Sequence, residues 1–524
     1  MVLRPPPATD TTKPLVSITS AASSSSSDES TISINEITKK AGVFYEKLRY
    51  SIDYREEHTI RRAAIERILS RNLLFSRDGR IARLLLEELI RAGYIENHKI
   101  PEKEVEEVQS LIDRFLLLEK VLSSRGESGG RIHKQLLSLA ATEIEIFFFD
   151  DTADRFVLQA FVDTVKANVR VPKTHLTSAE EDTQVYLACR RALLKSDEQS
   201  LTYSLWLRHY PTWHSSDQES ISSIAESFLS VEAVIRSELQ EKLGWYLVPK
   251  FKNYGIYFTV IKEIVARYGS EAERIFENKQ LLDEEIHGIL ENRYKRENAK
   301  TRKSSLRAII YIFLTKIILG MALELPYDIF FLHDIQFFAL GINMIFHPAL
   351  LFVITATIAP LGEKNTMLAI SGIHEIVYGE NVKTLHVKMQ RSRNIIRGVF
   401  LIMYSVVFLI SFSVIWLILQ KLDFNIVSIA LFMFFLALVS YFGIRIRFNA
   451  KRWQIVSGEE GTIAFLWNLF ALPIVEAGRW LSTKFQAINI FVFIMDFIIE
   501  NPYKLILKVS DAFVSFVKER RESI

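Results

Sequence analysis

Cysteine is nearly absent from this sequence, which has one, Cys189, in 524 residues. A single cysteine excludes an intrachain disulfide and any metal site built from several thiolates. We therefore expect Cys189 to be a small, buried apolar residue. A signal-peptide pattern is missing too, because residues 1–31 contain no continuous apolar segment and are rich in proline, serine and threonine. Any insertion into a membrane must then be directed by an internal segment.

The common catalytic signatures are also missing. The sequence has no P-loop, no dinucleotide-binding glycine pattern, no protein-kinase set and no G-x-S-x-G elbow. His374–Glu375 begins an HExxH-like pattern, but Tyr378 stands where the second zinc-binding histidine is required. The net charge of +3 is too small to indicate a polyanionic partner such as nucleic acid. We expect no catalytic residue, no metal site and no cofactor; a membrane-associated enzyme is a third alternative.

Two long apolar runs dominate the second half of the chain. Residues 398–420 and 426–444 carry no ionisable group apart from tyrosine hydroxyls, and a five-residue turn separates them. At about 1.5 Å per residue, each run crosses a hydrocarbon core of about 30 Å. The sequence therefore predicts a membrane hairpin at 398–444.

Two earlier apolar runs, 306–326 and 335–360, are less regular. Lys316 interrupts the first, and His347–Pro348 lies at the middle of the second. We expect a transmembrane region at 306–446 with about four spans. In a two-span alternative the first two runs form a re-entrant or monotopic segment.

Basic residues alternate along this region. They are dense at 293–307, absent at 327–334, dense at 361–397, reduced to Lys421 in the next turn, and dense again at 445–452. Lysine and arginine beside a span are retained in the cytoplasm. The pattern predicts four spans with both termini in the cytoplasm, and with the first 300 residues on the same side.

The remaining sequence indicates an all-α protein. Apolar residues recur with three-four spacing through two helical cytoplasmic subdomains, 34–122 and 131–300, which a glycine- and serine-rich linker joins. Residues 1–33 read as a disordered tail. Residues 453–524 read as amphipathic helices at the membrane surface or on the cytoplasmic region. Within them, the run 463–472 ends before Pro473 and is too short to span.

Four ionisable residues interrupt apolar segments and are the candidate intramembrane polar residues: Lys316, Glu324, His347 and Asp496. A cation near mid-membrane costs a few kcal/mol, so Lys316 should face protein or water. Alternatively the span is tilted and the lysine snorkels to the surface. Glu324 lies about 12 Å further along the helix, too far for direct pairing.

His347 and Asp496 each have two interpretations. His347 beside Pro348 is either a protonatable gate in a kinked helix or the donor of one interhelical hydrogen bond. Asp496 either binds a cation or anchors its helix at the surface.

Two further groups are expected to be structural. In the sequence HYPTWH, His209 and His214 do not have the spacing of a helical metal pair, so we expect aromatic packing around Trp213. Nine arginines between Arg49 and Arg83 form a cationic segment that suggests docking on anionic lipid or nucleic acid. Because carboxylates interleave them, we expect a solvated helical surface instead.

Several stretches of the chain together carry a resemblance to a known family. They are RRAAIERILSRNLL, LLLEELIRAGYI, YIFLTKIILGMALELPYD, ISGIHEIVYG, GRWLSTKFQAINIFVFIMDFIIENPYK and the ending FVKERRESI. They resemble an uncharacterised family of bacterial multi-pass inner-membrane proteins, over most of residues 35–524. The resemblance implies a bacterial inner-membrane location and one inherited architecture, and brings no activity, ligand or functional residue with it.

Two functions remain open at this point. The first is a membrane-anchored scaffold or adaptor, in which the helical cytoplasmic region binds another protein. The second is a transporter or channel component that uses Lys316, Glu324 and His347, since interrupted helices commonly line substrate paths. Four spans would then need a homo-oligomer to enclose a pore.

Overall fold

The structure is a computed structural model. It describes residues 56–75, 81–127, 129–149, 152–170, 176–333, 337–379, 385–386, 394–455 and 462–487, with isolated positions between 31 and 46. About 87% of it is helical, with almost no strands, which confirms the all-α fold class. The expected disordered tail at 1–30, the amphipathic segment at 488–524 and Asp496 lie outside the described residues.

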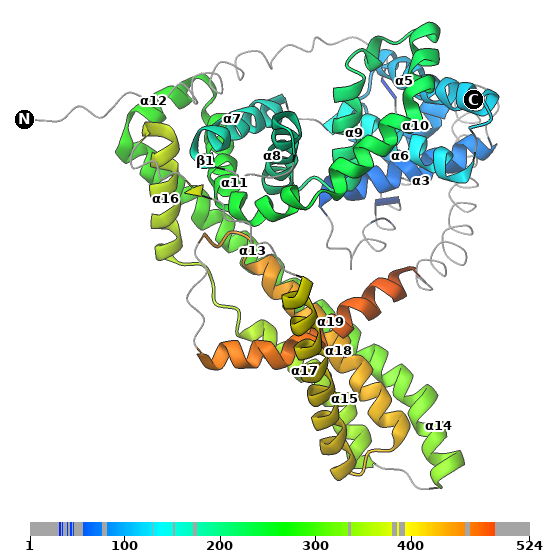
Figure 1. The fold of residues 1–524 in the computed structure, drawn as a ribbon, viewed down its shortest axis with the longest axis vertical. Coiled ribbons are helices and arrows are strands. Elements are labelled where there is room, and N and C mark those ends of the chain that lie inside the picture. The colour runs from blue at the N-terminus through cyan, green and yellow to red at the C-terminus, as the bar shows by residue number, and fades with distance from the viewer. Residues whose placement is uncertain are drawn as a thin grey trace, which may run out of the picture. The chain divides into compact units, whose positions relative to one another are not determined.

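The chain divides into two compact units. Unit 2 is formed mainly by Pro7–Arg274, and unit 1 by Ile275–Glu380 and His386–Ile490. The helices of unit 2 are α3 (Glu57–Phe75), α4 (Ile81–Ala92), α5 (Glu102–Ser124), α6 (Gly130–Phe149), α7 (Thr152–Asn168), α8 (Ser178–Leu193), α9 (Glu198–His209), α10 (Gln218–Gln240) and α11 (Lys242–Tyr268) (Figure 1). Short elements are β1 (Val169–Arg170), β2 (Leu385–His386), the 3-10 turns η2 (Trp213–Ser215) and η3 (Gly269–Glu271), and α12 (Ala272–Glu277).

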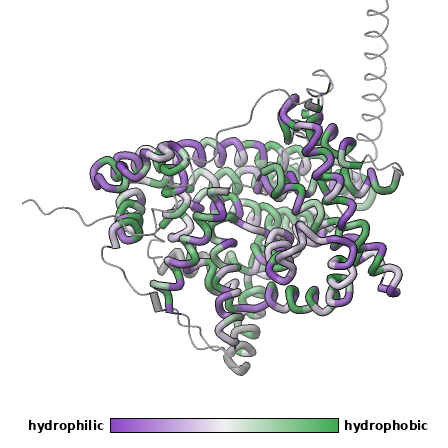
Figure 2. Tube along the Cα trace, turned by 90° about the horizontal axis from the view of Figure 1, so that it is seen from above, coloured by the Kyte–Doolittle hydropathy of each residue, from purple (hydrophilic) through white to green (hydrophobic). Residues whose placement is uncertain are grey.

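One hydrophobic core runs through α3–α6, α9 and α10 of unit 2. It draws buried residues from Ile32 to Leu239, so it includes both sides of the linker at 123–130. Hydrophilic and hydrophobic stretches alternate along most helices in Figure 2, as expected where each helix buries one face. The periodicity seen in the sequence therefore produces packed helices.

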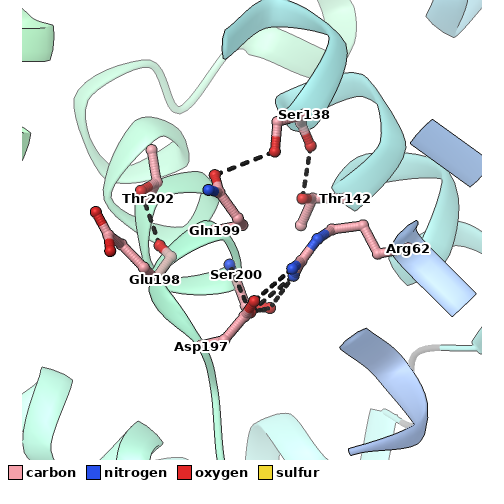
Figure 3. Close-up of polar contacts among 8 residues, drawn as sticks. All are labelled: Arg62, Ser138, Thr142, Asp197, Glu198, Gln199, Ser200 and Thr202. Atoms are coloured by element: carbon pink, nitrogen blue, oxygen red, sulfur yellow. Dashed lines mark hydrogen bonds and ion pairs between the residues drawn. The ribbon is translucent and has the colours of Figure 1, made fainter. Parts of the chain in front are cut away.

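A charged contact ties α3 to α9 (Figure 3). Arg62 is 6% exposed, and its two terminal nitrogens donate to both carboxylate oxygens of Asp197, one at 2.7 Å. Asp197 also caps α9 by accepting from the Ser200 backbone N–H at 3.2 Å. Burial alone would raise the pKa of Asp197, but the Arg62 and Ser200 hydrogen bonds outweigh it and lower this pKa to about 2.

Unit 1 begins with one long, irregular helix. It comprises α13 (Lys279–Leu319), the π-turn η4 (Gly320–Glu324), α14 (Leu325–Tyr327) and the π-turn η5 (Asp328–Leu332). The later helices are α15 (Phe337–Ala356), α16 (Glu363–Tyr378), α17 (Asn394–Lys421), α18 (Ile426–Ala450) and α19 (Thr462–Ala487). Among the described residues, four helices are long and apolar enough to cross a membrane: Lys279–Phe331, Phe337–Ala356, Ile402–Lys421 and Ile426–Ala450. They coincide with the four apolar runs of the sequence and confirm their number.

The short turns between the spans lie at one end of unit 1. The side-chain amide of Asn425, just before α18, donates to Asp328 of η5 at 2.7 Å. Asn425 follows the third span, and Asp328 lies near the end of the first. The end of the first span and the turn after the third are therefore neighbours.

Helix α19 is longer than the sequence predicts and packs against two of these spans. The sequence predicted that the run 463–472 ends at Pro473 and is too short to span. Helix α19 continues through Pro473 as one helix of 26 residues, so the expected break is wrong, but α19 is not one of the helices long and apolar enough to cross a membrane. Proline removes one backbone donor, which neighbouring helices in a packed bundle compensate. The helix packs against both α17 and α18 (Figure 1), whereas α17 and α18 contact each other little. The hairpin at 398–444 is thus held largely through α19.

We predict that Asp197→Ala lowers the free energy of unfolding by about 2–3 kcal/mol, because it leaves the buried Arg62 guanidinium unpaired and uncaps α9. Thermal unfolding of the full-length protein, followed by tryptophan fluorescence, measures the loss. Asp217→Ala is the matched control, since Asp217 caps α10 through the Ser220 N–H at 2.9 Å and is exposed. Equal losses in the two variants would contradict a specific role for the Arg62 pair.

Gly478 of α19 lies directly against the backbone of α18. A β-carbon there would lie 1.9 Å from the Ala437 carbonyl oxygen of α18 and 2.8 Å from Cβ of Tyr441. We predict that Gly478→Ala forces α19 from α18 and costs about 2 kcal/mol or more. Gly341→Ala, where no described atom lies within 4 Å of the added carbon, should leave the melting temperature unchanged or slightly higher.

Candidate functional site

Six of the buried polar side chains among the described residues of unit 1 lie near one another, and we call them the polar cluster. They are Lys316, Glu324, Asp328, Asn343, His347 and Ser428, each between 0% and 3% exposed. They come from α13, η4, η5, α15 and α18. Because polar groups without partners are costly at membrane depth, their hydrogen bonds decide whether the bundle is stable.

Two π-turns position the acidic members of the cluster. Glu324 ends η4 and Asp328 begins η5, with Pro326 in the single helical turn between them. Proline has no N–H to continue the α-helical ladder, so the irregularity has a local cause. A π-turn carries more residues per turn than an α-helix and rotates the side chains that follow it, and such turns are frequent at functional sites.

The Asn343 amide connects the two charged residues. Lys316 Nζ donates to Asn343 Oδ1, and Asn343 Nδ2 donates to the two carboxylate oxygens of Glu324 at 2.9 and 3.1 Å. The ammonium and the carboxylate are thus bridged by one amide. The expectation that Lys316 and Glu324 are too far apart to pair directly agrees with this arrangement.

Ser428 completes the surroundings of the carboxylate. Its hydroxyl donates to Glu324 Oε1, and its backbone carbonyl accepts from Asn343 Nδ2 at 3.4 Å. The Ser428 backbone N–H donates to the side chain of Asn425, which itself donates to Asp328. A chain of hydrogen bonds therefore leads from the turn between α17 and α18 to Glu324.

His347 lies at the inner end of the cluster. Its Nε2 is 3.0 Å from the Phe432 carbonyl oxygen of α18, and its Nδ1 is 3.3 Å from the Asn343 carbonyl oxygen. The predicted interhelical hydrogen bond is therefore present, and the gate stays a prediction. The rings of Phe432 and Phe435 pack on the imidazole, and Lys316 Nζ lies 4.9 Å from the centre of the Phe435 ring.

Three of the four predicted polar residues meet at this place. Lys316 is enclosed by protein, so the alternative in which it snorkels to the surface is wrong. Asn343, Ser428 and Asp328 were missed by the sequence reasoning. The spacing of Asn343 and His347, four residues apart in an otherwise apolar run, was the available signal.

The turn HYPTWH packs as expected. Trp213 is fully buried, with its ring centre 4.8 Å from that of Phe115 and 5.6 Å from that of Trp206. Its indole N–H donates to the buried carboxylate of Glu143 at 2.7 Å. His214 also contacts Glu143, at 3.2 Å. The predicted aromatic packing is confirmed.

The described arginines of the cationic segment form ion pairs with carboxylates elsewhere in the same chain. The ion pairs are Arg61–Glu145, Arg62–Asp197, Arg67–Glu46, Arg71–Glu88 and Arg83–Glu102. The expectation of a solvated surface is wrong for Arg62, which is buried. Arg49, Arg55, Arg77 and Arg80 lie outside the described residues. Arginines that neutralise carboxylates of the same chain are poorly placed to bind phosphates.

Two other residues singled out in the sequence are structural. Cys189 is fully buried, as expected, and burial raises the pKa of its thiol. His374 Nε2 lies 2.6 Å from a carboxylate oxygen of Asp283 in α13, which holds α16 against that helix. Among the described residues, no group of three or more histidine, cysteine, aspartate or glutamate side chains is placed to hold a metal ion.

We predict that the charges of Lys316 and Glu324 are energetically coupled. Lys316→Met leaves the buried carboxylate without its bridged ammonium and should cost about 3 kcal/mol. The double variant Lys316→Met/Glu324→Gln should cost clearly less than the sum of the two single changes. Thermal unfolding in one detergent measures all three.

Lys421→Met serves as the control, because this exposed lysine at the end of α17 belongs to the same unit. It should leave the melting temperature unchanged. Strict additivity of the two cluster substitutions would show that the Asn343 bridge transmits no coupling.

No protein-family model, no curated protein and no solved structure matches the chain. The polar cluster is therefore the main indication of what the protein does.

Proposed function

We propose that this protein translocates protons or monovalent cations across a membrane, with Glu324 as the central acceptor. The observation that supports it is the bridged Lys316–Asn343–Glu324 arrangement, buried where α15 and α18 pack against the irregular helix formed by α13 and η4. Ionisable groups inside membrane helices are expensive and mark ion pathways and proton relays. This is the second of the two functions left open by the sequence.

The order of the polar groups supplies a route. Asp328 and Asn425 lie at the turns, Glu324 and Ser428 lie further in, and Lys316 and His347 follow. On α18, Asn425, Ser428 and Phe432 succeed one another at helical spacing and face this route. An ion that approaches at the turns meets the carboxylate of Asp328 before that of Glu324.

The orientation of the protein follows from its charges. We infer that the short turns face away from the cytoplasm, because the basic residues at 293–307, 361–397 and 445–452 flank the opposite ends of the spans. Together with the family resemblance, this supports a bacterial inner membrane with cytoplasmic termini. Four spans enclose little space, so a homo-oligomer is part of the proposal.

A second candidate, the membrane-anchored adaptor, is favoured by a groove on unit 2. The groove has a volume of about 420 Å³ and lies between α5 and the start of α10. Its lining includes the acidic side chains Glu106, Asp113 and Asp217 beside Arg114. A cationic segment of a protein partner on the cytoplasmic side fits this chemistry.

Flux measurements test the first proposal. Full-length protein in liposomes that contain a pH- or sodium-sensitive dye should conduct an ion along an imposed gradient. Glu324→Gln removes the charged acceptor while keeping its shape, and should reduce the rate at least tenfold. Thr315→Ala is the control, because Thr315 is a polar residue of the same span that bonds its own helix, at Tyr311 O, and is outside the cluster.

Absence of flux of any tested ion would contradict translocation. If in-cell crosslinking then captured a protein at the groove between α5 and α10, the adaptor would be the better description. Equal flux through the wild-type protein and Glu324→Gln would contradict the assignment of Glu324.

A further inference from the structure

We propose that Glu324, Asn343 and Ser428 form a binding site for a monovalent metal cation, and that Lys316 occupies part of it as a tethered ammonium. This inference names the ion class and rests in part on the proposed translocation. Three oxygen atoms of two side chains lie together here: the two of the Glu324 carboxylate and the Ser428 hydroxyl. The Asn343 amide oxygen faces Lys316 on the other side of the same amide and would join them if that amide rotated. Oxygen ligands of this kind suit hard cations.

The position of the ammonium shows that a cation is accommodated. Lys316 Nζ donates to Asn343 Oδ1 on one side and lies over the Phe435 ring on the other. Both are surroundings that attract positive charge. The ammonium does not reach Glu324, however, because the Asn343 amide lies between them.

The carboxylate itself is held by neutral donors. The hydrogen bonds to its oxygens come from the Asn343 NH₂ group and from the Ser428 hydroxyl. A carboxylate offers about four lone-pair directions. Glu324 therefore retains acceptor capacity for a cation that contacts it directly, as Lys316 does not.

Asn343 makes the two occupants mutually exclusive. In the present orientation its oxygen faces Lys316 and its NH₂ group faces Glu324. Rotation of the amide by half a turn would direct the oxygen toward a cation on Glu324 and Ser428. The NH₂ group would then face the ammonium, donor against donor, and Lys316 would lose its acceptor. Cation binding and the Lys316 contact thus exclude each other through one side chain.

This exclusion gives a test that needs no transport assay. Lys316→Gln keeps a donor to Asn343 without the charge, and Lys316→Met removes the donor as well. The full-length protein is melted in detergent at pH 7 in LiCl, NaCl, KCl or choline chloride of equal ionic strength. The melting temperature of both variants should be about 3–5 °C higher in one alkali salt than in choline chloride, at cation concentrations well above the dissociation constant of the cation. The shift should reach a plateau as the salt concentration rises.

Two comparisons make the assignment specific. The wild-type protein should show a smaller shift, because its own ammonium competes. Adding Glu324→Gln to either lysine variant should abolish the difference between alkali salt and choline. Identical melting temperatures of both lysine variants in all four salts would overturn the site.

The inference survives poor folding of the variants. If neither lysine variant is stable, the wild-type protein and Glu324→Gln are compared in the same salts up to molar concentration. An alkali-specific shift lost in Glu324→Gln supports the site, and no shift overturns it. Proton flux without any alkali-specific shift would leave the proposed function standing and refute this site, whereas a shift without flux would do the reverse.

Discussion

The packing of three membrane helices depends on one amide placed between an ammonium and a carboxylate. Asn343 of α15 accepts from Lys316 of α13 and donates to Glu324 of η4, next to Ser428 of α18. Inside a bilayer, apolar side chains lose little by facing lipid instead of protein, so apolar packing alone fixes helix positions weakly. A buried charge that loses its partner costs several kcal/mol. The polar cluster therefore specifies which faces of α13, α15 and α18 meet.

The irregular backbone next to this cluster contributes to the same contacts. A straight α-helix from Gly320 to Leu332 would direct Glu324 and Asp328 differently relative to Lys316, whereas with the π-turns η4 and η5 both carboxylates lie in the interior. At α19 the close packing depends on a small residue. Because Gly478 has no side chain, the helix can approach the backbone of α18 at Ala437. The π-turns and Gly478 are thus each unfavourable for an isolated helix, but each allows a contact between helices that a regular helix would not make.

The sequence predicts well what depends on neighbouring residues. Four apolar spans, the all-α fold and the aromatic packing of Trp213 follow from local hydropathy, spacing and composition. It predicts poorly what depends on distant partners. Arg62 reads as one of many surface arginines until Asp197, 135 residues away, is placed against it. The sequence correctly places Lys316 and Glu324 too far apart along one helix to pair directly, but Asn343, which bridges them, comes from another helix. Its spacing from His347 marks Asn343 as a polar residue of that helix and does not show which residues it contacts.

Stability alone gives a weak reason for such a cluster. Replacing a buried ion pair with apolar side chains of similar volume is often neutral or stabilising, so leucine or methionine at both 316 and 324 need not lower the free energy of unfolding, although they would specify less well which helix faces meet. What apolar residues cannot supply is a site with two exclusive occupants. The Asn343 amide offers its oxygen to Lys316 in the structure, and in the proposed cation-bound state it would offer it to the Glu324–Ser428 side instead. A side chain with two such orientations, each favoured by a different cation, can switch between them as the bound cation changes. Ion translocation needs this switching, and a merely structural contact does not provide it.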